Sequence, residues 1–268
     1  MLNKSARASF SAAEKTGITV LPAAFLLFFL SPWLAIIPLV LFLLLCLAAP
    51  FFPGFSFFLP VISKGKAAGD NVCLTFDDGP SPSSTPVILE LLARHKLVAT
   101  FFVVGEKAAK YPQLIEDIIS AGHAIGNHSW DHDPLLMLRS QGKLQEDICN
   151  TQEVLVKLGV RTHVFRPPAA VTGPRLGQVL TSEGLVTITY SCRAMDRGNR
   201  NIRNLAAKIF NRLQPGDIIM LHDLVPYREG QMDCWQKELE MLFSGLREKY
   251  NIVSLEQIIQ QPVMTVLH

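Results

Sequence analysis

The chain contains no Asp, Glu, Lys, Arg or His between Thr16 and Ser63. Such a long stretch without an ionisable side chain is not expected on the surface of a water-soluble domain. A helix that crosses the roughly 30 Å hydrocarbon core of a bilayer needs about 20 mainly apolar residues. The absence of charge therefore predicts a membrane anchor over this stretch, made either of one long span or of two short ones.

Proline interrupts the uncharged stretch at Ser31-Pro32. Because proline cannot donate the helical hydrogen bond, we expect a break there and a hairpin of two helices, over 18–30 and 33–49. Phenylalanines alternate with Pro and Gly over 51–58, which indicates a segment lying at the membrane interface. A cleaved signal peptide is the alternative, but its apolar core would be about 7–15 residues long, shorter than this run.

Basic residues flank the uncharged stretch on both sides, with Lys4, Arg7 and Lys15 before it and Lys64 and Lys66 after it. For a hairpin, the positive-inside rule places both flanks in the cytoplasm, whereas a single span would send the C-terminal part outside. The five cysteines have no paired spacing, which fits a reducing compartment. We therefore expect a protein of the inner membrane with its C-terminal domain at the cytoplasmic face.

No basic run interleaved with aromatic residues occurs, and the net charge is only +2, so nucleic acid is not an expected partner. No internal repeat is present either. The length allows one domain beside the anchor. We expect a basic N-terminal tail (1–17), a hydrophobic anchor (18–62), a small polar linker (63–70) and a single C-terminal domain (71–268).

Short apolar runs alternate with helical patterns after the linker. The predicted strands cover 72–76, 99–104, 163–166, 186–191, 217–221 and 252–254. The predicted helices cover 86–95, 112–121, 142–158, 175–183, 202–213 and 232–248. Strands that are apolar on both faces and separated by helices indicate an α/β fold with a parallel sheet, open or closed.

Two acidic residues, Asp77 and Asp78, follow the first predicted strand, and His128 and His132 lie about fifty residues further on in His-Ser-Trp-Asp-His. Two histidines four residues apart share one face of a helical turn and can hold one ion together. A carboxylate from a strand end would complete a three-ligand set that leaves positions open for water, as in catalytic metal sites. The second carboxylate would then be available for the chemistry.

With Arg166-Pro167-Pro168 and the His222 that ends another predicted strand, these motifs give residues 70–258 a clear family likeness. The chain resembles the polysaccharide deacetylases of carbohydrate esterase family four, the NodB homology domain. The resemblance implies a distorted, incomplete (β/α) barrel, here preceded by a transmembrane segment or hairpin. In such folds functional residues gather at the C-terminal ends of the strands, and the motifs fall there.

The resemblance also implies roles for these residues. Asp78, His128 and His132 would bind one divalent metal ion, Zn²⁺ by default, with Co²⁺, Ni²⁺ or Mn²⁺ as alternatives that this ligand set does not exclude. Asp77 would be the general base and Arg166 the arginine that pairs with it, with a fork suited to a bidentate contact.

His222 would be the general acid, and Asp196 the carboxylate that keeps its imidazole protonated. The backbone N–H of Ala169 would help to hold the oxyanion. His95, His123 and His163 belong to no motif, so we expect structural roles for them.

The sequence departs from the family pattern in two places. Ala169-Ala170 stands where the family usually has Tyr-Gly, and Arg197 follows Asp196 where a Trp is frequent. Four arginines cluster in this second region: Arg193, Arg197, Arg200 and Arg203. They would either contact a phosphate or diphosphate or form a solvated basic loop. The missing aromatic rings indicate a different or smaller substrate than a long glycan.

The sequence thus predicts a membrane-anchored, metal-dependent hydrolase that removes N-acetyl or another small N-acyl group from amino sugars of a glycan such as peptidoglycan or a chitin-like oligosaccharide. The first alternative is a deacylase or deformylase of a polyprenyl-phosphate-linked amino sugar at the cytoplasmic leaflet. A second alternative, from another class, is a non-catalytic glycan-binding membrane protein. The expected partners are the glycan or lipid-linked sugar and the bilayer.

Overall fold

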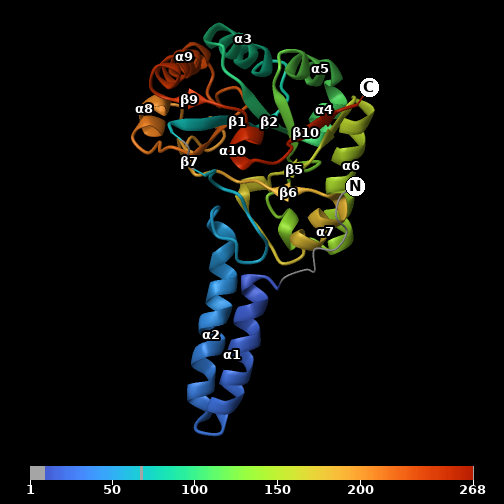
Figure 1. The fold of residues 1–268 in the computed structure, drawn as a ribbon, viewed down its shortest axis with the longest axis vertical. Coiled ribbons are helices and arrows are strands. Elements are labelled where there is room, and N and C mark those ends of the chain that lie inside the picture. The colour runs from blue at the N-terminus through green and yellow to red at the C-terminus, as the bar shows by residue number, and fades with distance from the viewer. Residues whose placement is uncertain (1–9, 67–68, 268) are drawn as a thin grey trace.

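The computed structural model describes residues 10–66 and 69–267. Its two parts are a projecting helical hairpin and an α/β domain (Figure 1). Lys4 and Arg7, used above to predict orientation, lie outside the described residues, as do two residues of the predicted linker and the terminal histidine.

The hairpin consists of α1 (Ala12–Phe28) and α2 (Pro32–Ala48), followed by a 3-10 helix over Ala49–Phe51. The predicted break at Ser31-Pro32 is confirmed, because Pro32 begins α2 at a position where its missing N–H has no cost. The N–H of Ala13 donates to the carbonyl of Phe57 at 2.9 Å, so both ends of the hairpin meet at the domain.

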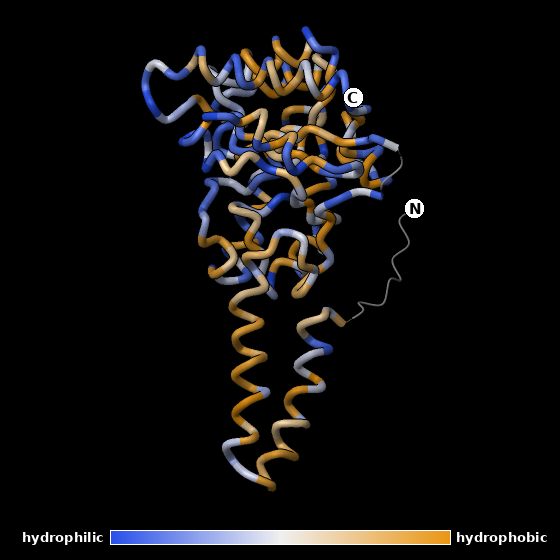
Figure 2. The backbone as a smooth tube through the Cα atoms, turned by 90° about the vertical axis from the view of Figure 1, so that its left-hand side faces the viewer, coloured by the Kyte–Doolittle hydropathy of each residue, from blue (hydrophilic) through white to orange (hydrophobic). Residues whose placement is uncertain are grey.

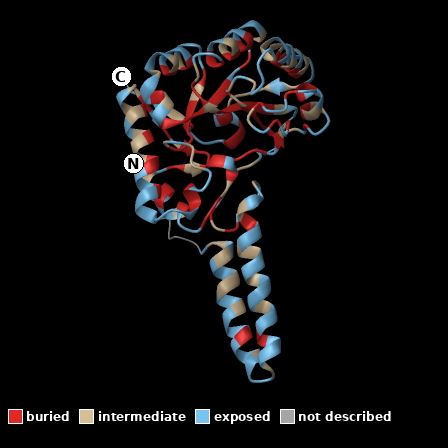
Figure 3. Ribbon diagram, turned by 180° about the vertical axis from the view of Figure 1, so that it is seen from behind, coloured by how far each residue is buried: buried red, intermediate tan, exposed pale blue. Residues whose placement is uncertain are grey.

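The hairpin consists mostly of hydrophobic residues (Figure 2), and most of its residues are exposed or only partly buried along its length (Figure 3). Trp33, for example, is 79% exposed. Among the described residues, one helical stretch, Pro32–Phe51, is long and apolar enough to cross a membrane, a test that a signal sequence also passes. The exposure argues against a helix buried in the core of a soluble domain, because α2 packs against α1 and most of its remaining apolar surface is not covered by other described residues.

The main sheet is parallel throughout and has the strand order β6-β5-β3-β2-β1-β8-β7, with β9 paired to β1. Its strands are β1 (Asn71–Gly79), β2 (Ala99–Val103), β3 (Ala124–Asn127), β5 (Val164–Phe165), β6 (Val186–Thr187), β7 (Cys192–Arg193), β8 (Ile218–His222) and β9 (Asn251–Ile252). A separate antiparallel pair joins β4 (Val160–Thr162) to β10 (Met264–Val266). The path ends at β6 and β7 without closing, so the expected incomplete (β/α) barrel is confirmed.

Helices cover the outer face of this curled sheet (Figure 1). They are α3 (Thr85–His95), α4 (Gly105–Lys110), α5 (Pro112–Ser120), α6 (Gln141–Lys157), α7 (Leu176–Glu183), α8 (Leu205–Phe210) and α9 (Met232–Lys249). The short α10 (Leu255–Ile259) instead packs against the inner face, where Leu255 and Ile258 contact the cluster that contains Cys73 and Met220. Short 3-10 helices lie between β3 and α6, at Leu136–Leu138, and between β5 and α7, at Pro168–Ala170. The largest apolar cluster lies between β1, β2, α3 and α9, where Phe76, Phe101 and Trp235 are almost fully buried.

The segment after the hairpin lies between the two ends of the open sheet. Ile62 pairs with Ile188 just after β6, and Lys64 pairs with Asp217 just before β8. Lys64 also forms an ion pair with Asp217 at 3.0 Å. The first residues of the predicted linker are therefore bonded to the domain.

The predicted elements agree with the structure except for several short strands and two short helices. The sequence analysis missed β3, β4, β7, β10, α4 and α10. The most consequential omission is β3 (Ala124–Asn127), because His128 follows it directly. The sequence does not indicate this strand, since its four residues include Gly126 and form no long apolar run. A Cβ at Gly126 would lie 2.5 Å from the Phe102 ring, so glycine is needed where β3 approaches β2.

This close approach gives a stability prediction. Gly126→Ala should lower the free energy of unfolding by about 1–3 kcal/mol, because both Phe102 and Val164 around the new methyl group are fully buried. Thermal unfolding of the full chain in detergent measures the effect as a lower Tm. Gly142→Ala is the matched control, since its Cβ meets nothing within 4 Å, and it should keep or slightly raise the Tm. Equal Tm values for the two variants would contradict the close packing of β3.

Candidate active site

The two adjacent carboxylates reach one cavity because β1 is irregular at its end. Successive side chains of a strand normally point to opposite faces. Here the register of β1 against β2 shifts between Asp77 and Gly79, and Asp78 has a φ of 73°. This bulge turns Asp78, so that both Asp77 and Asp78 line the same cavity.

His128 and His132 lie in the loop after β3, and the expectation that they share a helical turn is wrong. Ser129 and His132 have φ values of 70° and 57°, which fold the chain back on itself. The loop is held by the Asn127 side chain, which accepts from the Ser129 N–H at 2.9 Å, and by buried Asp147, which accepts from the Trp130 N–H at 2.9 Å. Local backbone turns thus bring the two imidazoles together.

The ligand atoms of Asp78, His128 and His132 lie within 4.8 Å of one another. The Nε2 atoms of His128 and His132 lie 3.3 Å and 3.0 Å from Asp78 Oδ1. Nδ1 of His128 donates to the carbonyl of Arg166 at 2.7 Å, because a carbonyl oxygen can only accept. The other ring nitrogen of His128, Nε2, faces the carboxylate oxygen Oδ1 of Asp78. This contact is favourable only when Nε2 carries a proton or when a cation lies between Nε2 and Oδ1. Two imidazole nitrogens and one carboxylate oxygen fit a zinc-type ion.

Electrostatics at these three residues favour the ionised carboxylate. Burial alone would raise the pKa of Asp78, but hydrogen bonds and positive charge from His128 and His132 hold it well below its usual range. Burial likewise acts to lower the pKa of His132, and the hydrogen bond and charge of Asp78 outweigh it, so this pKa is raised. A divalent cation would replace the proton in this role.

Asp77 is paired with a completely buried arginine. Arg166 follows β5 and is 0% exposed, and its Nη1 lies 2.6 Å from Asp77 Oδ1. The contact is through one nitrogen rather than the bidentate fork that the sequence suggested. The other hydrogen bonds of the guanidinium go to the Thr75 hydroxyl and the Thr189 carbonyl, both at 2.8 Å, and its plane lies over the Phe102 ring.

His222 ends β8 directly beside Asp77, because the two residues are register partners across β1 and β8. Its Nδ1 lies 2.8 Å from Oδ2 of buried Asp196. Burial acts to lower the pKa of His222, but the hydrogen bond and charge of Asp196, with smaller contributions from Asp78 and Asp77, raise it to about 9. The imidazole is therefore protonated at neutral pH.

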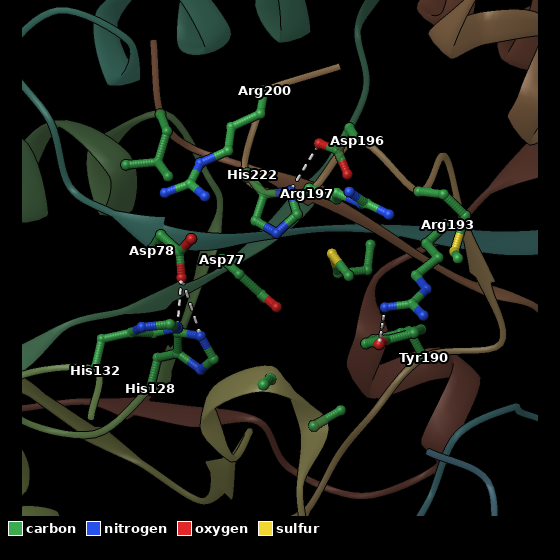
Figure 4. A pocket seen from close by; sticks show the side chains of 16 residues that line it. Asp77, Asp78, His128, His132, Tyr190, Arg193, Asp196, Arg197, Arg200 and His222 are labelled. Carbon is green, nitrogen blue, oxygen red and sulfur yellow. Dashed lines mark hydrogen bonds and ion pairs between the residues drawn. The ribbon is translucent and has the colours of Figure 1, made fainter. Parts of the chain in front are cut away.

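These groups surround one cavity of about 450 Å³ (Figure 4). Its walls are formed by Asp77, Asp78, His128, His132, Ala169, Ala170, Tyr190, Arg193, Met195, Asp196, Arg197, Gly198, Arg200, Met220, His222 and Leu224. In Figure 4 the Asp78–histidine group and the His222–Asp196 pair lie on different sides of Asp77. Ala169, with a φ of 53°, is also on the wall.

The remaining histidines that the sequence analysis set aside do not line this cavity. His95 contacts Glu240 at 2.9 Å, His163 contacts Thr265 at 2.8 Å, and His123 is buried against Phe101.

Two residues near the site carry no sequence signal that could have identified them. Lys107, on the unpredicted α4, donates to the backbone carbonyl of Asp78 at 2.6 Å and so holds the bulge. Buried Asn199 donates to the carbonyls of His222 and Leu224 at 3.2 Å and 2.6 Å, which fixes the end of β8 to the loop that carries Asp196.

Asp223 could have been noticed from its place beside His222. It is 0% exposed and accepts hydrogen bonds from the hydroxyls of Ser84 at 2.7 Å and Thr85 at 2.6 Å. Its N–H donates to the carbonyl of Asp77 at 2.7 Å. Asp223 thereby joins the end of β8 to the end of β1 and to the loop that follows it.

Comparisons with known proteins give a consistent result. Residues 64–188 match the family described as polysaccharide deacetylase. The chitooligosaccharide deacetylase of Azorhizobium caulinodans is 37% identical over 164 residues, which are 60% of this chain and 78% of that protein. The peptidoglycan-N-acetylglucosamine deacetylase PgdA of Listeria monocytogenes is 30% identical over 201 residues, which are 75% of this chain but only 41% of that protein.

The fold is likewise similar to solved structures. The crystal structure of the Bc1960 peptidoglycan N-acetylglucosamine deacetylase superposes with a TM-score of 0.69 at 27% identity, covering 78% of this chain and 95% of that one.

The Asp196–His222 contact gives a prediction that needs no assay of activity. Asp196→Asn should lower the pKa of His222 from about 9 to 6.5 or below, because burial then acts without the opposing carboxylate charge. An NMR pH titration of the His222 imidazole in the full chain measures this value. Asp117→Asn removes an exposed carboxylate on α5 and should not change it. An unaltered pKa in Asp196→Asn would remove Asp196 from the role of supporting His222.

Proposed function

The chain belongs to the polysaccharide deacetylase family, and from this premise we propose that it hydrolyses the N-acetyl group of an amino sugar in a metal-dependent reaction. The relatives reported above are named as chitooligosaccharide and peptidoglycan deacetylases. An N-acetylated hexosamine in a glycan is therefore the substrate class that the family relationship favours.

One observation carries the proposal. The three candidate ligands, Asp77 and the Asp196–His222 pair converge on the same cavity from segments at the C-terminal ends of different strands, and buried Arg166 supports Asp77 from behind. Hydrolysis of an amide needs an activated water, stabilisation of the carbonyl oxygen and a proton for the departing amine. Each of these requirements has a candidate group in this cavity.

The proposed first step uses Asp77 as general base. A divalent metal held by Asp78, His128 and His132 would supply Lewis acidity toward the amide carbonyl and would lower the pKa of water near it. Asp77 accepts the proton of the attacking water, and Arg166 keeps its carboxylate aimed into the cavity. Ala169 lies on the cavity wall, and its N–H would donate to the oxygen on which negative charge develops.

The proposed second step uses His222 as general acid. As the carbon–nitrogen bond breaks, Nε2 of His222 donates its proton to the sugar amine, and acetate leaves. Asp196 stabilises the protonated imidazole before this transfer. The raised pKa supports this order of events, because the proton is available at neutral pH. The non-catalytic alternative gives no reason for a general acid and a base on the same cavity.

We also propose that the hairpin anchors the enzyme in a membrane. Each helix has 17 residues and is about 25 Å long, slightly less than the roughly 30 Å of hydrocarbon in a bilayer. Both ends of the hairpin meet at the domain, which supports two short spans rather than one. Two spans keep the N-terminal flank and the domain on the same side, the cytoplasmic face by the positive-inside rule.

Substitution of the ligands tests the metal assignment. Asp78→Ala, His128→Ala and His132→Ala should each lose bound metal together with N-deacetylase activity, because two ligands do not hold a catalytic ion firmly. Elemental analysis of the purified full chain gives the metal content, and acetate release from N-acetylglucosamine oligomers gives the activity. His163→Ala, which removes an imidazole outside the cavity, should keep both.

The base is tested separately from the metal. Asp77→Asn should retain the metal but lower kcat by about 10²–10⁴-fold, the usual contribution of general base catalysis. Metal content and acetate release are measured on the same preparation. Turnover close to that of the unchanged protein would overturn the assignment of Asp77.

Reporter fusions test the topology. Green fluorescent protein fused after His268 should be fluorescent and alkaline phosphatase at the same place inactive, because the domain is expected in the cytoplasm. Fusions after Ser31, at the tip of the hairpin, should give the opposite result. Phosphatase activity after His268 would mean an outward-facing domain and would favour an extracellular glycan as substrate.

A further inference from the structure

Three arginines face into the proposed active site without a carboxylate partner. Arg193, Arg197 and Arg200 line the cavity. In the view of Figure 4, Arg193 and Arg197 lie between His222 and Tyr190, and Arg200 lies on the other side of His222, toward Asp78. Within residues 10–66 and 69–267, none of them forms an ion pair. The carboxylates of the cavity already have partners, because Asp77 contacts Arg166 and Asp196 contacts His222.

The loop that presents these arginines is held in a fixed, strained shape. Met195, Arg197 and Asn199 have φ values of 56°, 56° and 59°, in the left-handed region that non-glycine residues rarely adopt. Asn199 is 1% exposed and bonds to two carbonyls at the end of β8, and the Asn201 N–H donates to the Asp196 carbonyl at 2.9 Å. Strain maintained by surrounding contacts is typical of functional sites.

The same wall offers little to a neutral sugar. Among the described residues that line the cavity, Tyr190 is the only Phe, Tyr or Trp, and it is only 7% exposed. The Arg193 guanidinium lies 5.2 Å from the centroid of its ring and donates to its hydroxyl at 2.7 Å. No free aromatic face therefore remains on this wall for stacking on a pyranose ring.

We propose that the substrate is an amino sugar that carries a phosphate or diphosphate, bound by Arg193, Arg197 and Arg200 beside the acetamido group. This inference rests on the proposed function and specifies its substrate class. Guanidinium groups bind phosphate oxygens through charge-assisted, often paired hydrogen bonds, and three of them can serve the several oxygens of a phosphate. A substrate carboxylate would need only one guanidinium group, because a single arginine can bind both of its oxygens. A cavity of about 450 Å³ suits a single sugar with its head group.

The arginine wall also lies next to the base of the hairpin. The Thr189 hydroxyl donates to the carbonyl of Pro53 at 2.6 Å, and Tyr190 follows it directly in the chain. Figure 1 shows the hairpin leaving the domain beside β6 and β7, and Arg193 belongs to β7. A phosphate at this wall is therefore near the proposed membrane surface, so both a lipid-linked sugar phosphate and a soluble one need to be tested.

The experiment compares substrates that differ in charge. The metal-loaded full chain is assayed for acetate release from methyl N-acetylglucosaminide, N-acetylglucosamine 1-phosphate, UDP-N-acetylglucosamine and N-acetylmuramic acid, and from a polyprenyl-phosphate-linked N-acetylglucosamine in vesicles. We expect kcat/KM for the phosphate-bearing sugars to exceed that for the methyl glycoside by about tenfold or more, the effect of one charge-assisted hydrogen bond. A higher kcat/KM for the polyprenyl-phosphate-linked sugar in vesicles than for the soluble phosphate sugars identifies a lipid-linked substrate. An equal or lower kcat/KM identifies a soluble one.

Arginine variants then locate the preference. Arg197→Gln with Arg200→Gln should reduce kcat/KM for the phosphate sugars at least about tenfold more than for the methyl glycoside. The corresponding double change to Lys should restore part of the loss. Arg203→Gln, an exposed arginine that does not line the cavity, should change neither value. Thermal unfolding of each variant verifies that it is folded.

Three results would overturn the inference: equal kcat/KM for neutral and phosphate sugars, equal losses on both in the double variant, or a preference for the carboxylate of N-acetylmuramic acid. Calorimetry separates this outcome from failure of the proposed function. Arginine-dependent binding of N-acetylglucosamine 1-phosphate to Asp77→Asn, with no hydrolysis by the unchanged protein, would sink the deacetylase and keep the phosphate site. Hydrolysis of the methyl glycoside without any preference for the phosphate sugars would support the deacetylase and reject the phosphate site.

Discussion

The buried guanidinium of Arg166 connects the separate parts of this site. Its side chain donates to Asp77 and Thr75 on β1 and to the carbonyl of Thr189 after β6, while its own carbonyl accepts from Nδ1 of His128. A fully buried charge is tolerated only when it is paired and hydrogen-bonded, so these elements must keep their relative positions. The proposed base and one proposed metal ligand are thus oriented by a single residue.

The parallel register of the sheet explains why the other groups meet at this point. β1 and β8 are aligned so that Asp77 and His222 are neighbours, and both strands end at the same edge. The parallel sheet therefore brings the proposed acid and the proposed base, far apart in the sequence, to one cavity, where each has a different charged partner. Asp196 keeps His222 charged, whereas Asp77 is paired directly with Arg166.

The hairpin and the catalytic domain are joined by specific contacts rather than by a free tether. The Thr189 hydroxyl bonds to Pro53 at the base of the hairpin, and the Thr189 carbonyl bonds to Arg166 beneath Asp77. If the hairpin lies in a bilayer, the cavity has a defined position relative to that surface. An enzyme that acts on a sugar phosphate held at a membrane would need such a fixed placement, which connects the anchor with the arginine wall.

The sequence by itself determined the α/β class, the hairpin with its break at Ser31-Pro32 and the candidate residues at strand ends, because these depend on local apolar pattern, proline and short motifs. It did not determine β3 or the loop geometry of His128 and His132, which depends on left-handed backbone turns held by distant side chains. Only the tertiary structure decided that Asp78 turns into the cavity beside Asp77 and that three of the four clustered arginines line it while Arg203 does not. Both outcomes depend on packing between segments far apart in the chain, which a local pattern cannot encode.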